Sequence, residues 1–181
     1  MDADTLVAAI AQALPGVAID RAPSVDLQPT VYVQAGQLID AARGLRDRPE
    51  LKFDCLAEVT AVDFWPREPR FEVVYLLIAT DALLRLRLKV RLDGAAARLP
   101  SLSAVWPSAN WLEREVWDLF GIVFDGHPDP RRLLMPEDWE GFPLRKDYPV
   151  QINQRVKTSE PMQLTEEEFR ENLRRDRLTR G

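Results

Sequence analysis

The side chains best able to do chemistry gather between Trp111 and Pro149, where acids and arginines alternate with aromatic residues. The charged runs are Glu113-Arg114-Glu115, Asp118, Asp125, Asp129, Arg131-Arg132, Glu137-Asp138 and Arg145-Lys146-Asp147, with His127 among them. Two kinds of chemistry fit this mixture. Paired carboxylates can act as acid and base, whereas arginine forks that meet carboxylates beside aromatic rings are typical of an interface.

Glu115 and Asp118 are the candidate catalytic pair, because residues three apart lie on one face of a helix. Glycosidases use two carboxylates as acid and base. Nothing else in the sequence indicates a sugar-binding cleft, so a soluble carboxylate-dependent enzyme is the weaker interpretation. The interface interpretation is favoured.

Ligands for cofactors are scarce in this sequence. Cys55 and His127 are the only cysteine and histidine, too few for a four-ligand zinc site or an iron–sulfur cluster. No two of the 8 glycines are separated by a single residue, which excludes a G-x-G-x-x-G dinucleotide turn, and no Walker-type phosphate loop is present. We therefore expect no cofactor and no metal on this chain.

Composition and charge narrow the classes of partner. The chain has 181 residues, 46% of them hydrophobic, and 24 Lys plus Arg against 29 Asp plus Glu give a net charge of −5. This mild acidity argues against a nucleic-acid binder, which needs surplus positive charge. The uncharged stretch at residues 5–19 is too short to span a bilayer. We expect a cytoplasmic protein that meets a membrane only through a partner.

Hydrophobic periodicity predicts one α+β domain over residues 1–120, with a small mixed or antiparallel sheet and flanking helices. Helices are expected at residues 6–14, at 38–45, and from an N-cap at Ser108 to a C′ glycine at Gly121. Strands are expected at 17–19, 30–33, 51–64, 71–79 and 84–91. The last strand alternates leucine or valine with Arg85, Arg87, Lys89 and Arg91. This row is either a docking stripe or, the favoured interpretation, a solvated sheet face.

Residues 121–181 form an expected proline-rich arm. Five prolines between positions 121 and 150 and the absence of a clear period argue against a helix or strand there. The same stretch is too apolar for disorder. An extended segment laid on its own domain or on another protein fits both facts. A capping box at Thr165–Glu168 predicts a short C-terminal helix in this docking arm.

The order of the motifs between Trp111 and Pro149 carries a resemblance. The elements are Glu113-Arg114-Glu115 with Asp118, Phe120-Gly121-Ile122, Gly126-His127-Pro128, Arg131, Leu133, Pro136-Glu137-Asp138, Glu140-Gly141 and Pro143 to Pro149. Together they resemble the signature of the 30 kDa subunit family of respiratory complex I, which is the C subunit of the bacterial NADH–quinone oxidoreductase. Phe142 departs from the family, which usually has histidine there.

This resemblance implies a non-catalytic subunit of the hydrophilic arm of a proton-translocating NADH–quinone oxidoreductase, peripheral on the cytoplasmic side of the inner membrane. Its implied partners are the 49 kDa-type quinone-site subunit and the ferredoxin-like cluster subunit, while FMN, iron–sulfur clusters and quinone belong to partner subunits. The equivalent subunit of a membrane hydrogenase or of a ferredoxin-fed complex is the alternative. The implied interface residues are Glu113, Arg114, Glu115, Asp118, His127, Arg131, Arg145, Lys146 and Asp147. For His127, a hydrogen bond within its own domain is an equal possibility.

We predict that the purified chain is colourless and free of metal, because it lacks the ligands for a cluster or a zinc ion and has no nucleotide turn. Elemental analysis and the visible absorption spectrum of well-washed protein check this. Iron, zinc or flavin in a stoichiometric amount would contradict it.

Overall fold

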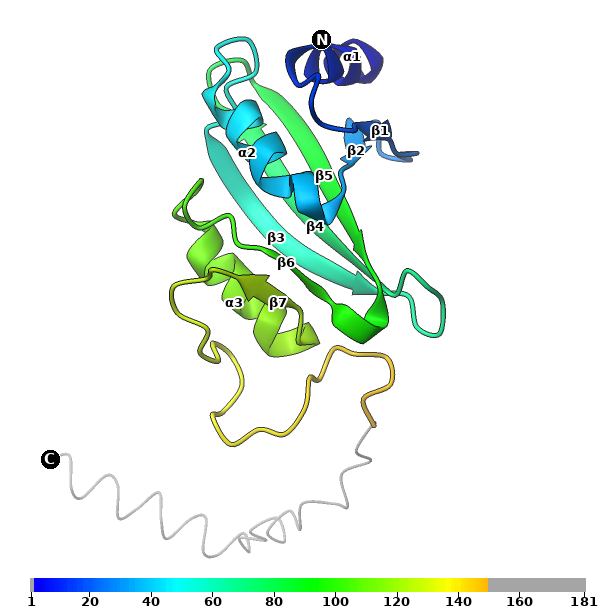
Figure 1. The fold of residues 1–181 in the computed structure, drawn as a ribbon, viewed down its shortest axis with the longest axis vertical. Coiled ribbons are helices and arrows are strands. Elements are labelled where there is room, and N and C mark those ends of the chain that lie inside the picture. The colour runs from blue at the N-terminus through cyan, green and yellow to red at the C-terminus, as the bar shows by residue number, and fades with distance from the viewer. Residues whose placement is uncertain (1, 150–181) are drawn as a thin grey trace, which may run out of the picture. The chain divides into compact units, whose positions relative to one another are not determined.

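The computed structural model describes residues 2–149, which form a sheet with helices beside it (Figure 1). Its helices are α1 (Ala3–Ala13), α2 (Leu38–Asp47) and α3 (Ala109–Phe120), with short 3-10 turns at Ala35–Gln37 and Gly94–Ala96. Its strands are β1 (Asp20–Arg21), β2 (Thr30–Tyr32), β3 (Cys55–Asp63), β4 (Phe71–Ala79), β5 (Leu84–Leu92), β6 (Arg98–Pro100) and β7 (Val123–Asp125).

The main sheet has five strands in the order β1-β2-β5-β4-β3. Strands β3, β4 and β5 are antiparallel neighbours, with Val74 opposite Thr60 on one side and Lys89 on the other. β2 pairs with β5 in parallel, which makes the sheet mixed. The expected α+β fold, a small mixed sheet with flanking helices, is confirmed.

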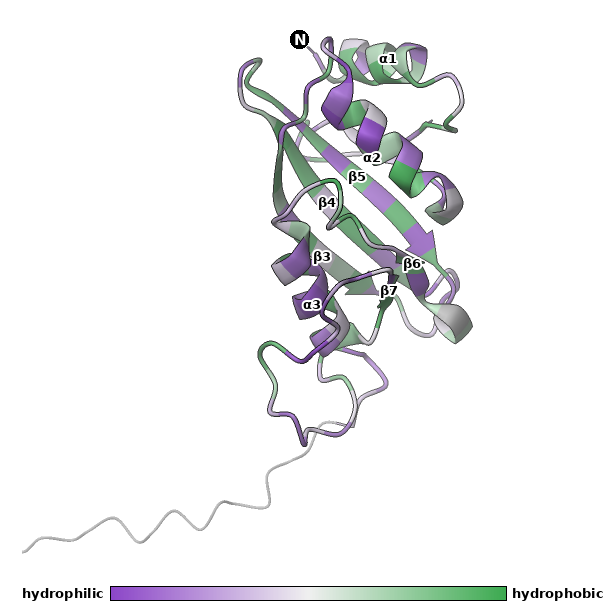
Figure 2. Ribbon diagram, turned by 60° about the vertical axis from the view of Figure 1, so that its left-hand side comes forward, coloured by the Kyte–Doolittle hydropathy of each residue, from purple (hydrophilic) through white to green (hydrophobic). Residues whose placement is uncertain are grey.

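The alternation in β5 decides which face of the sheet is covered. Leu86, Leu88 and Val90 are fully buried, and α2, α3, β6 and β7 lie over one face of the sheet (Figures 1 and 2). On the other face, Arg87 pairs with Asp26, and Lys89 pairs with Glu72. These pairs within the chain favour the solvated-face interpretation of the basic stripe over a docking role.

Several local features differ from the sequence-based expectation. Residues 17–19 are not a strand, and β3 begins at Cys55 because the chain first turns through Lys52, whose φ is +47°. Ser108 does not cap α3 with its side chain, since its hydroxyl donates to the Leu56 carbonyl oxygen (3.0 Å). The parallel pair β6–β7 was not predicted, because strands of three residues are too short for a period to appear.

The first part of the arm belongs to the same compact unit as the sheet. That unit extends from Met1 to Tyr148, whereas the sequence placed the division at Phe120. After β7, residues 126–149 contain no helix and no strand, as expected for an arm. The predicted C-terminal helix lies outside the described residues. Among residues 2–149, no helix has both the length and the apolar character needed to cross a membrane.

Candidate docking site

Helix α3 carries the first half of the charged signature and ends at a glycine for two reasons. Gly121 has a φ of +71°, and its N–H donates to the Trp117 carbonyl oxygen (2.8 Å), as in a left-handed C-terminal cap. A Cβ atom on Gly121 would also lie 2.4 Å from the ring of Phe142. The helix end and the arm therefore touch where a side chain would not fit.

The Asp118 carboxylate, completely buried on α3, holds the arm by four hydrogen bonds. One oxygen, Oδ2, accepts from the backbone N–H groups of Leu133, Leu134 and Met135 (3.0, 2.7 and 2.9 Å). The other, Oδ1, accepts from Nη1 of Arg132 (2.7 Å). Burial by itself would raise the pKa of Asp118, but these donors outweigh it and lower the pKa below its ordinary value.

Arg132 extends this contact to the end of the segment. Its Nη2 donates to the carbonyl oxygens of Trp139 (2.7 Å) and Gly141 (3.2 Å). The guanidinium also lies 5.8 Å from the ring centroids of both Trp117 and Phe142. A loop without secondary structure thus satisfies several of its backbone groups with one side chain.

Arg114 and His127 join the loop after β7 to α3. Arg114 donates to the carbonyl oxygens of Arg131 and Arg132 (both 3.0 Å) and lies 3.5 Å from an Asp129 oxygen. His127 accepts at Nδ1 from the Asp129 N–H (3.0 Å), so its hydrogen is assigned to Nε2, which donates to the Asn110 carbonyl oxygen (2.9 Å). Both ring nitrogens of His127 therefore bind within its own domain.

A second ionic contact, between buried Asp63 and Arg70 and the more exposed Asp147, holds the far end of the segment. Arg70 donates with Nε and Nη2 to the two oxygens of Asp63 (2.9 and 2.8 Å) and with Nη1 and Nη2 to those of Asp147 (2.9 and 2.6 Å). Asp63 also accepts from the Lys146 N–H (2.9 Å). Burial opposes ionisation of Asp63, yet Arg70 and the backbone donors lower its pKa to about 2. Asp63 and Arg70 flank the loop between β3 and β4.

Arg145 stabilises the C-terminal end of α3. Its guanidinium donates to the carbonyl oxygens of Phe120 and Gly121 and lies over the rings of Phe71 and Phe142. A cation at this end of a helix interacts favourably with the helix dipole. The resemblance implies an interface role for Arg145 and Asp147, and in the structure both of them have partners in their own chain.

The nine predicted interface residues fall into two groups. Seven bind within the domain: Glu113, Arg114, Asp118, His127, Arg131, Arg145 and Asp147. The other two, Glu115 and Lys146, have side chains with no hydrogen bond or ion pair among residues 2–149. Their role at an interface stays a prediction.

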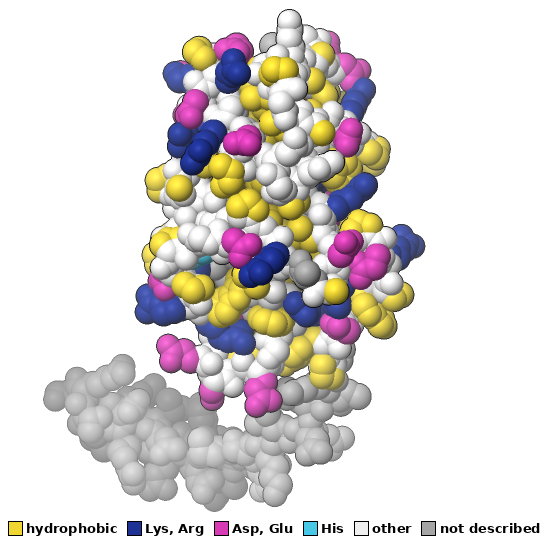
Figure 3. Space-filling view, in the orientation of Figure 1, with side chains coloured by type: hydrophobic (Ala, Val, Ile, Leu, Met, Phe, Trp, Pro, Cys, Tyr) yellow, Lys and Arg dark blue, Asp and Glu magenta, His cyan; other side chains and the backbone are white. Residues whose placement is uncertain are grey.

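Exposed apolar side chains accompany these charges. Trp111 is 60% exposed, Leu134 60% and Leu144 51%, all within the signature segment. On the face shown in Figure 3, acidic and basic side chains are interspersed with apolar ones, and neither sign of charge forms a single patch. A surface with this mixture is better suited to bind another protein than to bind a nucleic acid.

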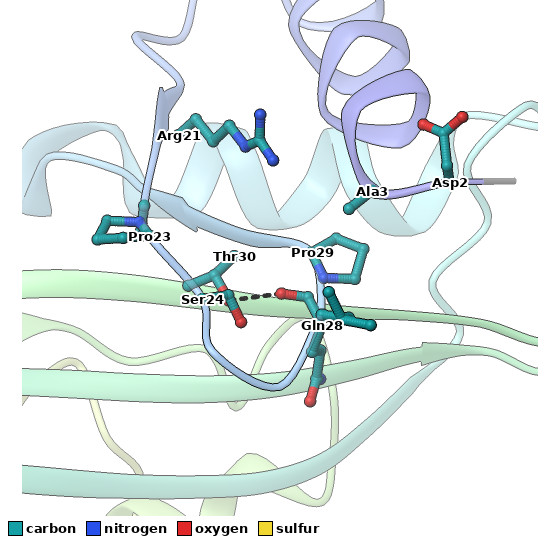
Figure 4. A pocket seen from close by; sticks show the side chains of 10 residues that line it. Asp2, Ala3, Arg21, Pro23, Ser24, Gln28, Pro29 and Thr30 are labelled. Carbon is teal, nitrogen blue, oxygen red and sulfur yellow. Dashed lines mark hydrogen bonds between the residues drawn. The ribbon is translucent and has the colours of Figure 1, made fainter.

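The remaining hollows offer little for catalysis or metal binding. An open hollow of about 650 Å³ beside α1 and β2 is lined by Asp2, Arg21, Leu27 and Gln28 together with prolines and small side chains, and the Thr30 hydroxyl there donates to the Gln28 carbonyl oxygen (Figure 4). In the part of the chain that the structure describes, no three His, Cys, Asp or Glu side chains gather closely enough to hold a metal ion. Glu115 and Asp118 do not share a catalytic cleft, since Asp118 is fully engaged by the arm.

Three important residues were missed by the sequence analysis. Arg132 was noted as charged but not selected, although it contacts more of the arm than Arg131 does. Asp63 and Arg70 lie outside the signature, and the pairing of Arg70 with Asp147 joins residues 77 positions apart. Pro66 and Pro69, which precede Arg70, are typical of a turn between two strands, but nothing in the sequence indicates which residue Arg70 binds.

Comparison with known proteins decides the family. The family described as "Respiratory-chain NADH dehydrogenase, 30 Kd subunit" matches residues 31–154, which include the main strands, α3 and the whole signature. The chain belongs to this family.

Individual known proteins are similar to this chain in sequence and in structure. The C subunit of NADH-quinone oxidoreductase from Roseiflexus sp. (strain RS-1) is 54% identical over 67% of this chain and 70% of its own length. The trypsin-resistant fragment (1-134) of Nqo5 superposes with a TM-score of 0.54 at 30% identity, covering 71% of this chain and 99% of the fragment. A chain of the membrane-bound sulfane sulfur reductase, an archaeal respiratory membrane complex, gives 0.67 at 28% identity, with 82% and 86% covered.

Asp118→Asn should lower the free energy of unfolding by about 3–5 kcal/mol, because it removes the buried anion that binds the half-buried Arg132 guanidinium and three backbone N–H groups of the arm. The matched control is Asp125→Asn, which breaks the exposed pair between Asp125 and Arg98 and should cost less than about 1 kcal/mol. Urea denaturation of both variants measures the two losses. Equal small losses would show that Asp118 does not hold the arm.

Proposed function

We propose that this chain is a non-catalytic docking subunit of the hydrophilic arm of a proton-translocating NADH–quinone oxidoreductase. Its partners are the 49 kDa-type quinone-site subunit and the ferredoxin-like cluster subunit. By positioning these two, it supports electron transfer from NADH to quinone. The family membership and the relatives named as subunits of NADH-quinone oxidoreductase support this proposal.

The observation that carries the proposal is the way the signature segment is built. Residues 126–149 have no helix or strand, yet buried ionic contacts at Asp118 and Arg70 fix their backbone. An irregular segment held in one conformation loses little further entropy on binding. The apolar side chains that it leaves exposed, such as Leu134 and Leu144, are then available to a partner.

The chemistry belongs to the partner subunits in this proposal. FMN, the iron–sulfur clusters and quinone are bound by the neighbours, and this chain supplies no ligand to them. The scarcity of cysteine and histidine supports this division, since clusters need several thiolates. The chain is then peripheral on the cytoplasmic side of the inner membrane and contacts the membrane only through the complex.

A related membrane complex with a different electron donor is the second candidate. The match to a chain of the sulfane sulfur reductase supports it, because that complex is respiratory but is not named for NADH. A membrane hydrogenase or a ferredoxin-fed quinone reductase would use the same docking subunit. The proteins that co-purify separate the two candidates: flavin- and NADH-binding subunits favour the first.

Replacing an exposed apolar residue of the signature by a charge should weaken assembly without unfolding the chain. We expect Leu134→Asp and Leu144→Asp to reduce the yield of co-purified partner subunits by about tenfold, because an unpaired charge would be buried in the interface. The melting temperature of the isolated chain should hardly change.

The control is Leu83→Asp, at a leucine that is also exposed but lies in the turn between β4 and β5, outside the signature. It should leave the yield unchanged. Wild-type yield from both signature variants would contradict docking through this segment.

A further inference from the structure

Glu113 differs from the other buried acids that hold the arm and the sheet together. Its side chain on α3 is 0% exposed, and its two oxygens accept from the Leu102 N–H (2.7 Å) and the Ser101 hydroxyl (2.6 Å). Both donors are neutral. Asp63 and Asp118, in contrast, each face an arginine.

Arg114 and His127, which line the same hollow as Glu113, are engaged with other partners. Arg114 directs its guanidinium to Asp129 and to two backbone carbonyl oxygens. His127 uses both of its ring nitrogens in hydrogen bonds to the backbone. Within residues 2–149, no cation forms an ion pair with Glu113.

From β4, the group that faces Glu113 is Tyr75. This side chain is fully buried, and its hydroxyl has no hydrogen-bond partner in the described part of the chain. Burial, and secondarily the charge of Glu113, raise the pKa of Tyr75 well above its ordinary value, so the hydroxyl stays neutral. Tyr75 therefore gives an ionised Glu113 no compensating charge.

A small hollow borders Glu113. The hollow has a volume of about 40 Å³ and is lined by Glu113, Arg114, Trp117, His127 and apolar neighbours. This is enough for a water molecule, and the lining offers polar groups to bind one.

We propose that Glu113 is a buried proton-binding site that holds a proton in the folded domain, and that ionisation of this carboxyl group destabilises the domain. The proton passes between the carboxyl oxygen and water, and no other reactant is needed. This inference goes beyond the docking function and does not rest on it.

The direction of the effect on stability follows from the environment of Glu113. Burial raises its pKa to about 7, although Ser101 and Leu102 oppose the shift. An acid with a raised pKa contributes its full stabilisation at pH values below its pKa in the unfolded chain, which is about 4.3 for glutamate. That stabilisation is lost as the pH rises through the pKa in the folded chain. Asp63 and Asp118 have lowered pKa values, so they titrate on the acid side of this range.

The test uses the full isolated chain, so its failure leaves the docking proposal untouched. We expect the Glu113 side-chain carboxyl carbon, followed by NMR, to titrate near neutral pH rather than near the ordinary value of about 4.3. The melting temperature of the wild type should fall by several degrees between about pH 5 and pH 8.

Glu113→Gln should remove that fall, because the amide stays neutral. The matched control, Glu115→Gln on the same helix, should retain it. His127→Gln should also retain it, which matters because histidine is the other residue type that changes charge in this range. An ordinary acidic titration of Glu113 in the wild type would overturn the proposal. A fall in melting temperature that disappears in His127→Gln would also overturn it. The NMR titration of Glu113 in the wild type decides the question even if Glu113→Gln does not fold.

Discussion

The hydrogen bonds accepted by the buried carboxylate of Asp118 fix the path of a segment that has no secondary structure of its own. Backbone N–H groups that leave water need partners, and an irregular segment cannot supply them from within. Three successive amides, Leu133 to Met135, find theirs on a single oxygen of Asp118. The position of α3 on the sheet therefore sets where the arm runs.

The contacts of Asp118 and Arg70 with the arm are made by charged groups, which bind in a defined geometry. An apolar contact permits sliding, whereas the fork of Arg70 meets Asp63 and Asp147 in one geometry only. Buried ion pairs add little net stability compared with well-packed apolar groups, but they impose a defined arrangement. A subunit whose function is to present a fixed surface gains from such contacts. Glu113, the buried acid without a cation, is the exception, and it is the acid for which we infer a bound proton.

Much of the fold was predictable because it rests on short-range patterns. The alternation in β5 and the helical period that ends at Gly121 appear directly in the residue order, and the family resemblance followed from the motifs around them. The partner of Asp147 was not predictable, since Arg70 lies 77 residues away and only the folded sheet brings it near. The residue types of the signature indicated an interface, but not that Asp118 and Arg145 turn inward.

Hydrogen exchange of the isolated full chain tests the central claim most directly. If Asp118 holds the arm, the amides of Leu133, Leu134 and Met135 exchange slowly before any partner is present. The amides of residues 137 and 138, which donate no hydrogen bond in the described part of the chain, provide the internal comparison and should exchange rapidly. Rapid exchange at all five positions would contradict the account, because the arm would then be ordered only by its partners.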